Sequence, residues 1–172
     1  MKAVDIPRRD WYAPQEKAGH GRGPGRAEAT MNDKVALRED HTPYQTVIGW
    51  DYTVAADGSA ECTLAVREDL FNSRQALRAV HGGAIYSLAD GAMGGALYSL
   101  LGEDEWGATA EMRITYLLPV LDGTLSCQAR VVRREGKTAT LEAAVLSHGQ
   151  VVARATATWH IRQTGPGGRS KT

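Results

Sequence analysis

The stretch from Val80 to Leu101, VHGGAIYSLADGAMGGALYSLL, constrains the fold more than any other part of the chain. Between His81 and Glu103 it holds a single charged side chain, Asp90, in a run of Ala, Leu, Ile, Met and Gly. Such a run predicts a helix that is apolar on every side, and a helix of this kind must be buried. A carboxylate on a buried helix is costly without a partner, so the pattern indicates a specific local reason for Asp90.

The five glycines of this stretch predict two different roles. Gly82 and Gly83 lie where the chain turns into the helix, where they let a ligand approach free backbone N–H groups and the positive end of the helix dipole. Gly91, Gly94 and Gly95 lie inside the helix, each at a cost of about 1 kcal/mol relative to alanine. We expect them where another backbone packs closely against the helix.

Helix geometry separates the predicted anion site from the carboxylate. Asp90 is eight positions after Gly82, which is about 12 Å along a helix at 1.5 Å per residue. Asp90 is therefore too far away to act on a group held at its own helix N-terminus. If two such helices lie antiparallel in a homodimer, each Asp90 faces the other chain's turn, and two equivalent composite sites result.

Length and charge exclude several classes of protein. The chain has 172 residues, enough for one domain with a core plus tails. Its 20 basic and 20 acidic residues balance, which predicts neither a nucleic-acid partner nor an anionic membrane partner. The long apolar stretch contains Asp90 and five glycines, so it does not predict a membrane span. The N-terminus lacks the apolar core of a secretory signal, and we therefore expect a cytoplasmic protein.

The cysteine and histidine positions do not predict a metal site. Cys62 and Cys127 are isolated in the sequence, and we expect both to be reduced packing residues. The histidines show no ligand spacing; they are His20, His41, His81, His148 and His160. No metal and no resident cofactor is expected.

Composition and turn signals divide the chain. Residues 1–29 are rich in Gly, Pro and charge, and we expect a mostly disordered tail, followed by a domain over 30–162 and a second loose tail over 163–172. A short helix is expected from Thr30 to Asp40. Two β-rich runs, 44–54 and 59–67, flank Asp57-Gly58 and predict a β-hairpin.

Four further strand-like runs follow the apolar stretch. They cover 106–117, 123–135, 138–147 and 150–162, and short turn-forming segments separate them. Strands this close together favour an antiparallel sheet, which we expect to be a four-strand meander. The predicted fold class is α+β, with one long central helix wrapped by a curved sheet of about five or six strands.

The segment HGGAIYSLAD, with GATAEMRITYLLPVLDG downstream, resembles the acyl-CoA thioesterases of the phenylacetate-pathway (PaaI-like) group, which have the hotdog fold. The likeness covers roughly residues 42–162. It implies hydrolysis of acyl-CoA thioesters in a homodimer with composite active sites, with CoA as part of the substrate. Whether dimers pair further into tetramers stays open.

The resemblance also implies roles for individual residues. Asp90 matches the catalytic acid, and Gly82 matches the backbone amide that polarises the thioester carbonyl. Gln75 matches an Asn or Gln near the reacting group, and Thr109 matches a Ser or Thr that helps to hold the attacking water. His81 is expected chiefly to fix the turn through a backbone hydrogen bond, with direct catalysis as the alternative.

Other expected site residues would bind the substrate. Gly83 is expected at the anion site, and Arg113, Arg133 and Arg134 are expected near the CoA phosphates. Further basic candidates are Arg74, Arg78 and Lys137. Many relatives have an Asn followed by Gly before the HGG motif, whereas this chain reads NSRQALRAVHGG, so Asn72 is an alternative to Gln75.

The chemistry of the residues is consistent with thioester hydrolysis independently of the resemblance. Amides at a helix N-terminus can stabilise charge that develops on a carbonyl oxygen. A carboxylate can act as a general base on water or as a nucleophile through an anhydride, and the sequence does not choose between them. Two alternatives are a non-catalytic acyl-CoA-binding protein, which has no need of Asp90, and an acyl-thioester hydratase or dehydratase, which would need an Asp/His pair.

Overall fold

The computed structural model describes residues 41–73 and 78–163. The expected tail 1–29, the expected helix from Thr30 to Asp40 and the side chain of Gln75 lie outside the described residues. The elements, in chain order, are α1 Pro43–Ile48, β1 Trp50–Ala56, β2 Ser59–Ala65, the 3-10 helix η1 Glu68–Leu70, α2 Gly82–Tyr98, β3 Glu105–Tyr116, β4 Thr124–Glu135, β5 Thr138–Ser147 and β6 Gln150–Gln163.

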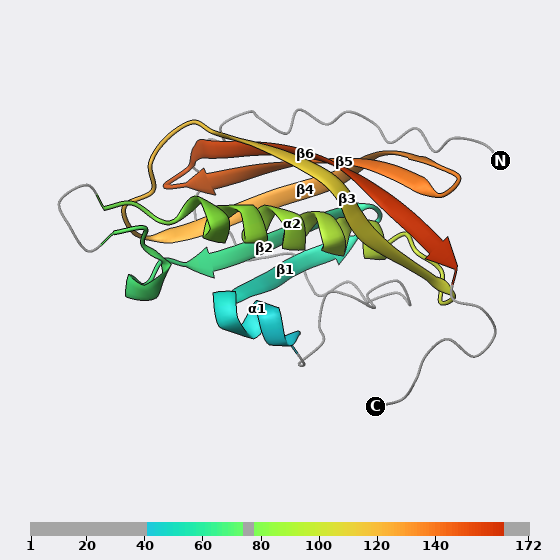
Figure 1. The fold of residues 1–172 in the computed structure, drawn as a ribbon, viewed down its shortest axis with the longest axis horizontal. Coiled ribbons are helices and arrows are strands. Elements are labelled where there is room, and N and C mark those ends of the chain that lie inside the picture. The colour runs from blue at the N-terminus through green and yellow to red at the C-terminus, as the bar shows by residue number, and fades with distance from the viewer. Residues whose placement is uncertain (1–40, 74–77, 164–172) are drawn as a thin grey trace, which may run out of the picture.

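The strands form one antiparallel six-stranded sheet in the order β1-β2-β4-β5-β6-β3. Figure 1 shows α2 lying along the inner face of this curved sheet, with β1 and β3 on opposite sides of the helix. The arrangement is the α+β hotdog architecture that the sequence predicts. It encloses the helix because a helix that is apolar all round needs a cover on most of its surface.

The position of β3 differs from the expected four-strand meander. Two-residue links join β4, β5 and β6, which are direct neighbours, but β3 pairs with β6 at the far edge of the sheet. The link from β3 to β4 covers residues 117–123 and can span about 23 Å at 3.3 Å per residue. Three strand spacings amount to about 14 Å. The seven-residue link is therefore long enough to connect β3 to β4 across β6 and β5, whereas a two-residue turn is not.

Two predicted turns are confirmed. Asp57 and Gly58 have φ of 49° and 77°, and His148 and Gly149 have φ of 49° and 76°. Positive φ at both central residues is the requirement of a two-residue type I′ hairpin. The β1–β2 and β5–β6 hairpins are thus set locally by these dipeptides.

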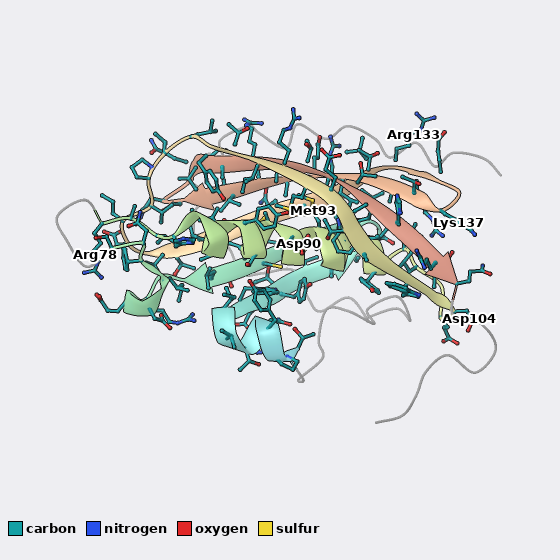
Figure 2. All side chains as sticks on the ribbon, in the orientation of Figure 1. Arg78, Asp90, Met93, Asp104, Arg133 and Lys137 are labelled. Atoms are coloured by element: carbon teal, nitrogen blue, oxygen red, sulfur yellow. The ribbon has the colours of Figure 1, made fainter. Side chains whose placement is uncertain are left out.

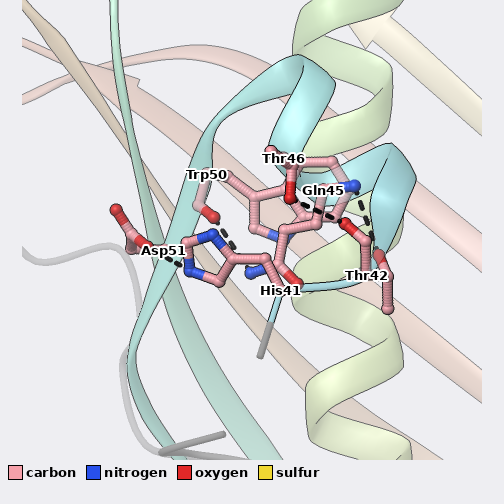
Figure 3. A network of polar contacts seen from close by, with 6 residues as sticks. All are labelled: His41, Thr42, Gln45, Thr46, Trp50 and Asp51. Carbon is pink, nitrogen blue, oxygen red and sulfur yellow. Dashed lines mark hydrogen bonds and ion pairs between the residues drawn. The ribbon is translucent and has the colours of Figure 1, made fainter. Parts of the chain in front are cut away.

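The start of the expected first strand is wrong, because Pro43–Ile48 forms α1. The Thr42 side chain caps this helix by accepting a hydrogen bond from the Gln45 N–H at 3.2 Å, and Pro43 occupies its first turn. Gly49 ends it at φ 85°. The Gln45 amide then donates to the Trp50 carbonyl oxygen at 3.0 Å and fixes the step from helix to strand, as Figure 3 shows.

The core lies between α2 and the sheet. The helix contributes Leu88, Met93 and Leu97, all fully buried, and the sheet contributes Leu125 and Leu141 among others. Burial of each such side chain stabilises the fold by about 1.5–3 kcal/mol. Cys62 and Cys127 are also fully buried, are directly paired in register between β2 and β4, and are free thiols as expected.

The glycines inside α2 accommodate aromatic rings, not a second backbone as expected. A Cβ at Gly95 would lie 2.4 Å from Tyr52 Cε1, and one at Gly91 would lie 2.7 Å from Trp50 Cε2. At Gly94 the nearest atom is Cη2 of the Trp159 ring, at 3.2 Å. The small residues therefore let β1 and β6 pack large side chains on the helix.

No helix in the described part of the chain is long and apolar enough to cross a membrane.

Candidate active site

Asp90 lies in the middle of α2 and is partly buried (Figure 2). Thr109 of β3 donates its hydroxyl hydrogen to Asp90 Oδ1 at 2.6 Å. Burial raises the pKa of the Asp90 carboxyl above its ordinary value, and the hydrogen bond from Thr109 acts in the opposite direction. The structure thus brings together these two predicted site residues in a form suited to a general base.

A local irregularity of β3 accompanies this contact. The register of β3 with β6 shifts between Thr109 and Glu111, so that Ala110 is an extra residue in the strand. Such bulges bend a strand and redirect the side chains beside them. Thr109 lies at the bulge and faces the helix carboxylate, whereas its Cα partner Trp159 packs against Gly94.

The side of α2 next to Asp90 is closed by β1. The Tyr52 hydroxyl donates to the Gly91 carbonyl oxygen at 2.7 Å. Burial raises the pKa of Tyr52, and the nearby Cys62 and Asp90 add to the rise, so this phenol stays neutral. Asp90, whose pKa burial also raises, is therefore the group of this region that can act as a base when it is charged.

The N-terminus of α2 presents one free amide. The His81 side chain caps the helix, with Nδ1 accepting from the Gly83 N–H at 2.9 Å. The Ala84 N–H donates to the His81 carbonyl oxygen at 2.9 Å. Among the described residues, no acceptor contacts the Gly82 N–H. The Gly82 N–H is thus available as a donor among the described residues, whereas the N–H of Gly83, which was also expected at the anion site, is already used by the cap.

The cap also defines what His81 does. Its backbone N–H donates to the Leu70 carbonyl oxygen at 2.7 Å, so both its main chain and its ring hold the turn. This is the structural role that was expected for His81. A ring nitrogen that accepts a backbone hydrogen bond is not available at that atom as a catalytic base.

Tyr116, at the end of β3, is a site residue that the sequence reasoning missed. Its hydroxyl donates to the Gly82 carbonyl oxygen at 2.8 Å. A Cβ at Gly82 would lie 3.0 Å from the Tyr116 ring, so a larger residue at position 82 would need the ring to shift slightly. The contact fixes the peptide plane that follows Gly82. An aromatic residue in a strand gives no sequence signal for such a contact with a distant helix start.

An apolar pocket of about 370 Å³ opens beside Gly82. Its floor includes the buried side chains of Val80, Ile85 and Val120. The other lining residues are Gly82, Tyr116, Leu117, Leu118 and Pro119. A pocket of this size is within the range of small-molecule sites, about 300–1,000 Å³. The candidate site therefore combines a free amide with an adjoining apolar volume.

The loop before the helix places Asn72 in a structural role. Its side-chain oxygen accepts from the Ala79 N–H at 3.2 Å, while its own N–H donates to the Ala79 carbonyl oxygen at 2.9 Å. These bonds close the base of the loop. Residues 74–77, with Arg74 and Gln75, lie outside the described residues, so the predicted role of Gln75 stays a prediction.

Two of the expected phosphate-binding arginines form pairs within the chain. Arg133 bonds to Glu135, and Arg134 donates to Glu105 at 2.6 Å and to the Leu100 carbonyl oxygen at 3.1 Å.

The basic residues expected to bind the CoA phosphates lie at different ends of the molecule. Figure 2 shows Arg133 and Lys137 at the opposite end of the molecule from Arg78. Arg78 stacks over Phe71 at 4.0 Å from the ring centroid and bonds to Glu68. Arg113 is exposed on β3. A role in CoA binding stays a prediction for all of these residues.

Comparison with known proteins places the chain in a family. The family described as the thioesterase superfamily matches residues 78–160, which include the helix start, Asp90 and β3. A conserved protein of Pseudomonas aeruginosa is 31% identical, with a TM-score of 0.66, over 75% of this chain and 98% of that one. The chain belongs to the thioesterase superfamily.

Other solved structures have the same fold. The PaaI protein from the phenylacetic acid degradation operon of Escherichia coli is 25% identical, with a TM-score of 0.62, over 69% of this chain and 83% of that one. A mutant thioesterase enzyme of Staphylococcus aureus, at 17% identity and a TM-score of 0.65, shares the fold over 70% of this chain and 99% of that one. No curated protein matches the chain significantly. The PaaI-like resemblance seen in the sequence is thus confirmed.

Proposed function

We propose that this thioesterase-superfamily protein hydrolyses acyl-CoA thioesters to free CoA and a carboxylic acid. The observation that carries the proposal is the partly buried Asp90 carboxylate, bonded to Thr109, on a helix whose first amide has no acceptor among the described residues. Superfamily membership supports the same reaction.

Each group has a defined part in the reaction. The Gly82 N–H and the positive end of α2 stabilise the negative charge that develops on the thioester oxygen. As general base, Asp90 takes a proton from water while the water oxygen bonds to the carbonyl carbon. The C–S bond then breaks, the thiolate leaves and is protonated, and the acyl group departs as an acid. As nucleophile, Asp90 would instead form an anhydride that water hydrolyses.

A second copy of the chain supplies the other half of each site in this proposal. Gly82 and Asp90 of one helix are about 12 Å apart along the axis, so one subunit cannot bring them to the same carbonyl. Strand β3 supports such pairing, because it is a 12-residue edge strand whose outer side has no strand partner among the described residues. Long unpaired edges are the usual templates for strand addition from another chain.

Asp90→Asn tests the carboxylate. It keeps the size of the side chain and its acceptor oxygen for Thr109, but it removes the base. We expect a loss of at least about 10²-fold in kcat with an acyl-CoA panel, measured as free thiol. The enoyl absorbance is recorded in the same assay. Activity within a few-fold of the parent, or an enoyl product without thiol release, would contradict the proposal.

Subunit exchange tests the composite site. Asp90→Asn and Gly82→Pro each remove one half of the chemistry, and a heterodimer has one site with both defects and one intact site. A random mixture should therefore regain about a quarter of the parental activity. Proline is tolerated in the first turn of a helix. If mass measurements show exchange but no activity returns, the two groups act within one subunit or Gly82 is not the donor.

Gly82→Ala is the matched control for the proline variant. Both substitutions place a Cβ 3.0 Å from the Tyr116 ring, and only proline removes the N–H. Tyr116 is 48% exposed, so its ring has room to move. The activity lost by Gly82→Pro beyond that lost by Gly82→Ala measures the contribution of the amide.

A further inference from the structure

The apolar pocket beside Gly82 indicates which acyl groups the site accepts. We infer that this pocket binds the hydrocarbon part of an uncharged acyl group and excludes acyl groups that carry a charge. The inference rests on the proposed function and identifies its substrate class. Gly82 supplies the free N–H and also lines the pocket, so the two features are adjacent. A thioester held at that amide therefore has the pocket directly beside its carbonyl.

The chemistry of the lining favours a hydrocarbon. Among the described residues that line the pocket, none is Lys, Arg, His, Asp or Glu. The Leu117 and Leu118 N–H groups both donate to the Val152 carbonyl oxygen, at 2.8 and 3.2 Å. Pro119 has no N–H, and the Tyr116 hydroxyl already donates to Gly82. Apart from the Gly82 N–H, which the thioester oxygen uses in the proposed reaction, the described lining offers a charged group no oppositely charged side chain, so its loss of hydration would be unfavourable.

The same reasoning excludes the other part of the substrate from the pocket. The pantetheine arm of CoA carries amide groups, whose burial without hydrogen bonds is unfavourable. The acyl chain carries only apolar surface beyond its carbonyl. The floor of the pocket is buried core, since Val80, Ile85 and Val120 are each at most 5% exposed. A hydrocarbon placed there contacts side chains that already exclude water.

The rim of the pocket offers a matched pair of positions for a test. Leu118 lines the pocket and is 46% exposed, whereas Leu121 does not line it and is 59% exposed. Leu118→Asp and Leu121→Asp thus introduce the same charge at similarly exposed sites on one loop. Thermal melting and mass in solution, recorded for both, show whether folding and assembly are kept. If Leu118→Asp does not fold, Leu118→Trp takes its place, because it fills the pocket without a charge.

The assay compares butanoyl-CoA with succinyl-CoA, which differ by a terminal carboxylate, and adds hexanoyl-CoA. We expect kcat/KM for butanoyl-CoA to exceed that for succinyl-CoA by at least about 100-fold. A buried methylene contributes about fourfold, so hexanoyl-CoA should exceed butanoyl-CoA by about tenfold or more. Leu118→Asp should lower kcat/KM for hexanoyl-CoA by at least about tenfold, and Leu121→Asp by less than about twofold.

The results separate failure of the inference from failure of the proposed function. If the parent protein releases no thiol from any acyl-CoA, the proposed function falls, and the inference falls with it. If it hydrolyses succinyl-CoA as well as butanoyl-CoA, the reaction stands and the inference is overturned. The inference is equally overturned if the Asp variants at 118 and 121 have the same acyl preference. A rim variant that loses its assembly as well as its preference would place a second chain, not an acyl group, in the pocket.

Discussion

The adjacent glycines Gly94 and Gly95 allow a quantitative test of how α2 is seated. Each Gly→Ala change gains about 1 kcal/mol of helix propensity, so this gain cancels when the two variants are compared. The contacts do not cancel, because the new Cβ would lie 2.4 Å from Tyr52 Cε1 at position 95 and 3.2 Å from Trp159 Cη2 at position 94.

The cost of the closer contact follows from what surrounds Tyr52. Its hydroxyl is bonded to the Gly91 carbonyl oxygen, so the ring cannot retreat without losing that bond. A Cβ at Gly95 would also lie 3.2 Å from the Ala60 Cβ. Overpacking of this kind costs about 1–3 kcal/mol. We expect Gly95→Ala to be less stable than Gly94→Ala by that amount.

Urea unfolding of the two variants measures the difference in the free energy of unfolding. A double-mutant cycle with Tyr52→Ala adds a control, because without the ring Gly95→Ala should no longer be destabilising. Equal stability of the two glycine variants, or no coupling between positions 52 and 95, would refute the packing argument. Either result would mean that the rings of β1 do not fix the helix that carries Asp90.

Two further predictions concern Asp90. Because burial raises the pKa of Asp90 in the folded protein, a charged Asp90 opposes folding near neutral pH. Asp90→Asn should therefore raise the melting temperature at pH 7. The gain should vanish in melts below about pH 4, where Asp90 is protonated in both the folded and the unfolded protein. Thr109→Val removes the bond that lowers this pKa, so the acid limb of the kcat/KM profile should move to higher pH, whereas Thr109→Ser should keep it in place. An unchanged limb in Thr109→Val would show that Asp90 does not control the rate.

Most of the fold could be predicted from local signals. The four strands after the helix were expected within one residue of their observed ends, because Gly and Pro separators are strong local signals. The segment 44–48 was misassigned because its β-branched and aromatic residues outweighed the Thr42-Pro43 helix start. The far-edge place of β3 could not be predicted, because pairing partners depend on contacts distant in sequence.

The candidate site was predictable where a residue conflicts with its local environment. Asp90 stands out because a charge in an apolar helix is costly. The family resemblance predicts that Thr109 lies in the site, and in the structure its hydroxyl donates to Asp90. Tyr116 and the pocket could not be predicted, because each depends on which strand end meets the helix start.

The pairing of β3 with β6 has a consequence for the order of events during synthesis. Glu105 pairs with Gln163, and Tyr116 pairs with Ala153, so the inner edge of β3 has no strand partner until the last strand of the domain is made. The ribosome therefore releases α2, whose surface is almost wholly apolar, before the four later strands β3 to β6 that complete its cover. Contacts so distant in sequence form late and slowly. The nascent chain thus exposes an apolar helix and an open strand edge together, and this interval is when a chaperone would be of most use to it.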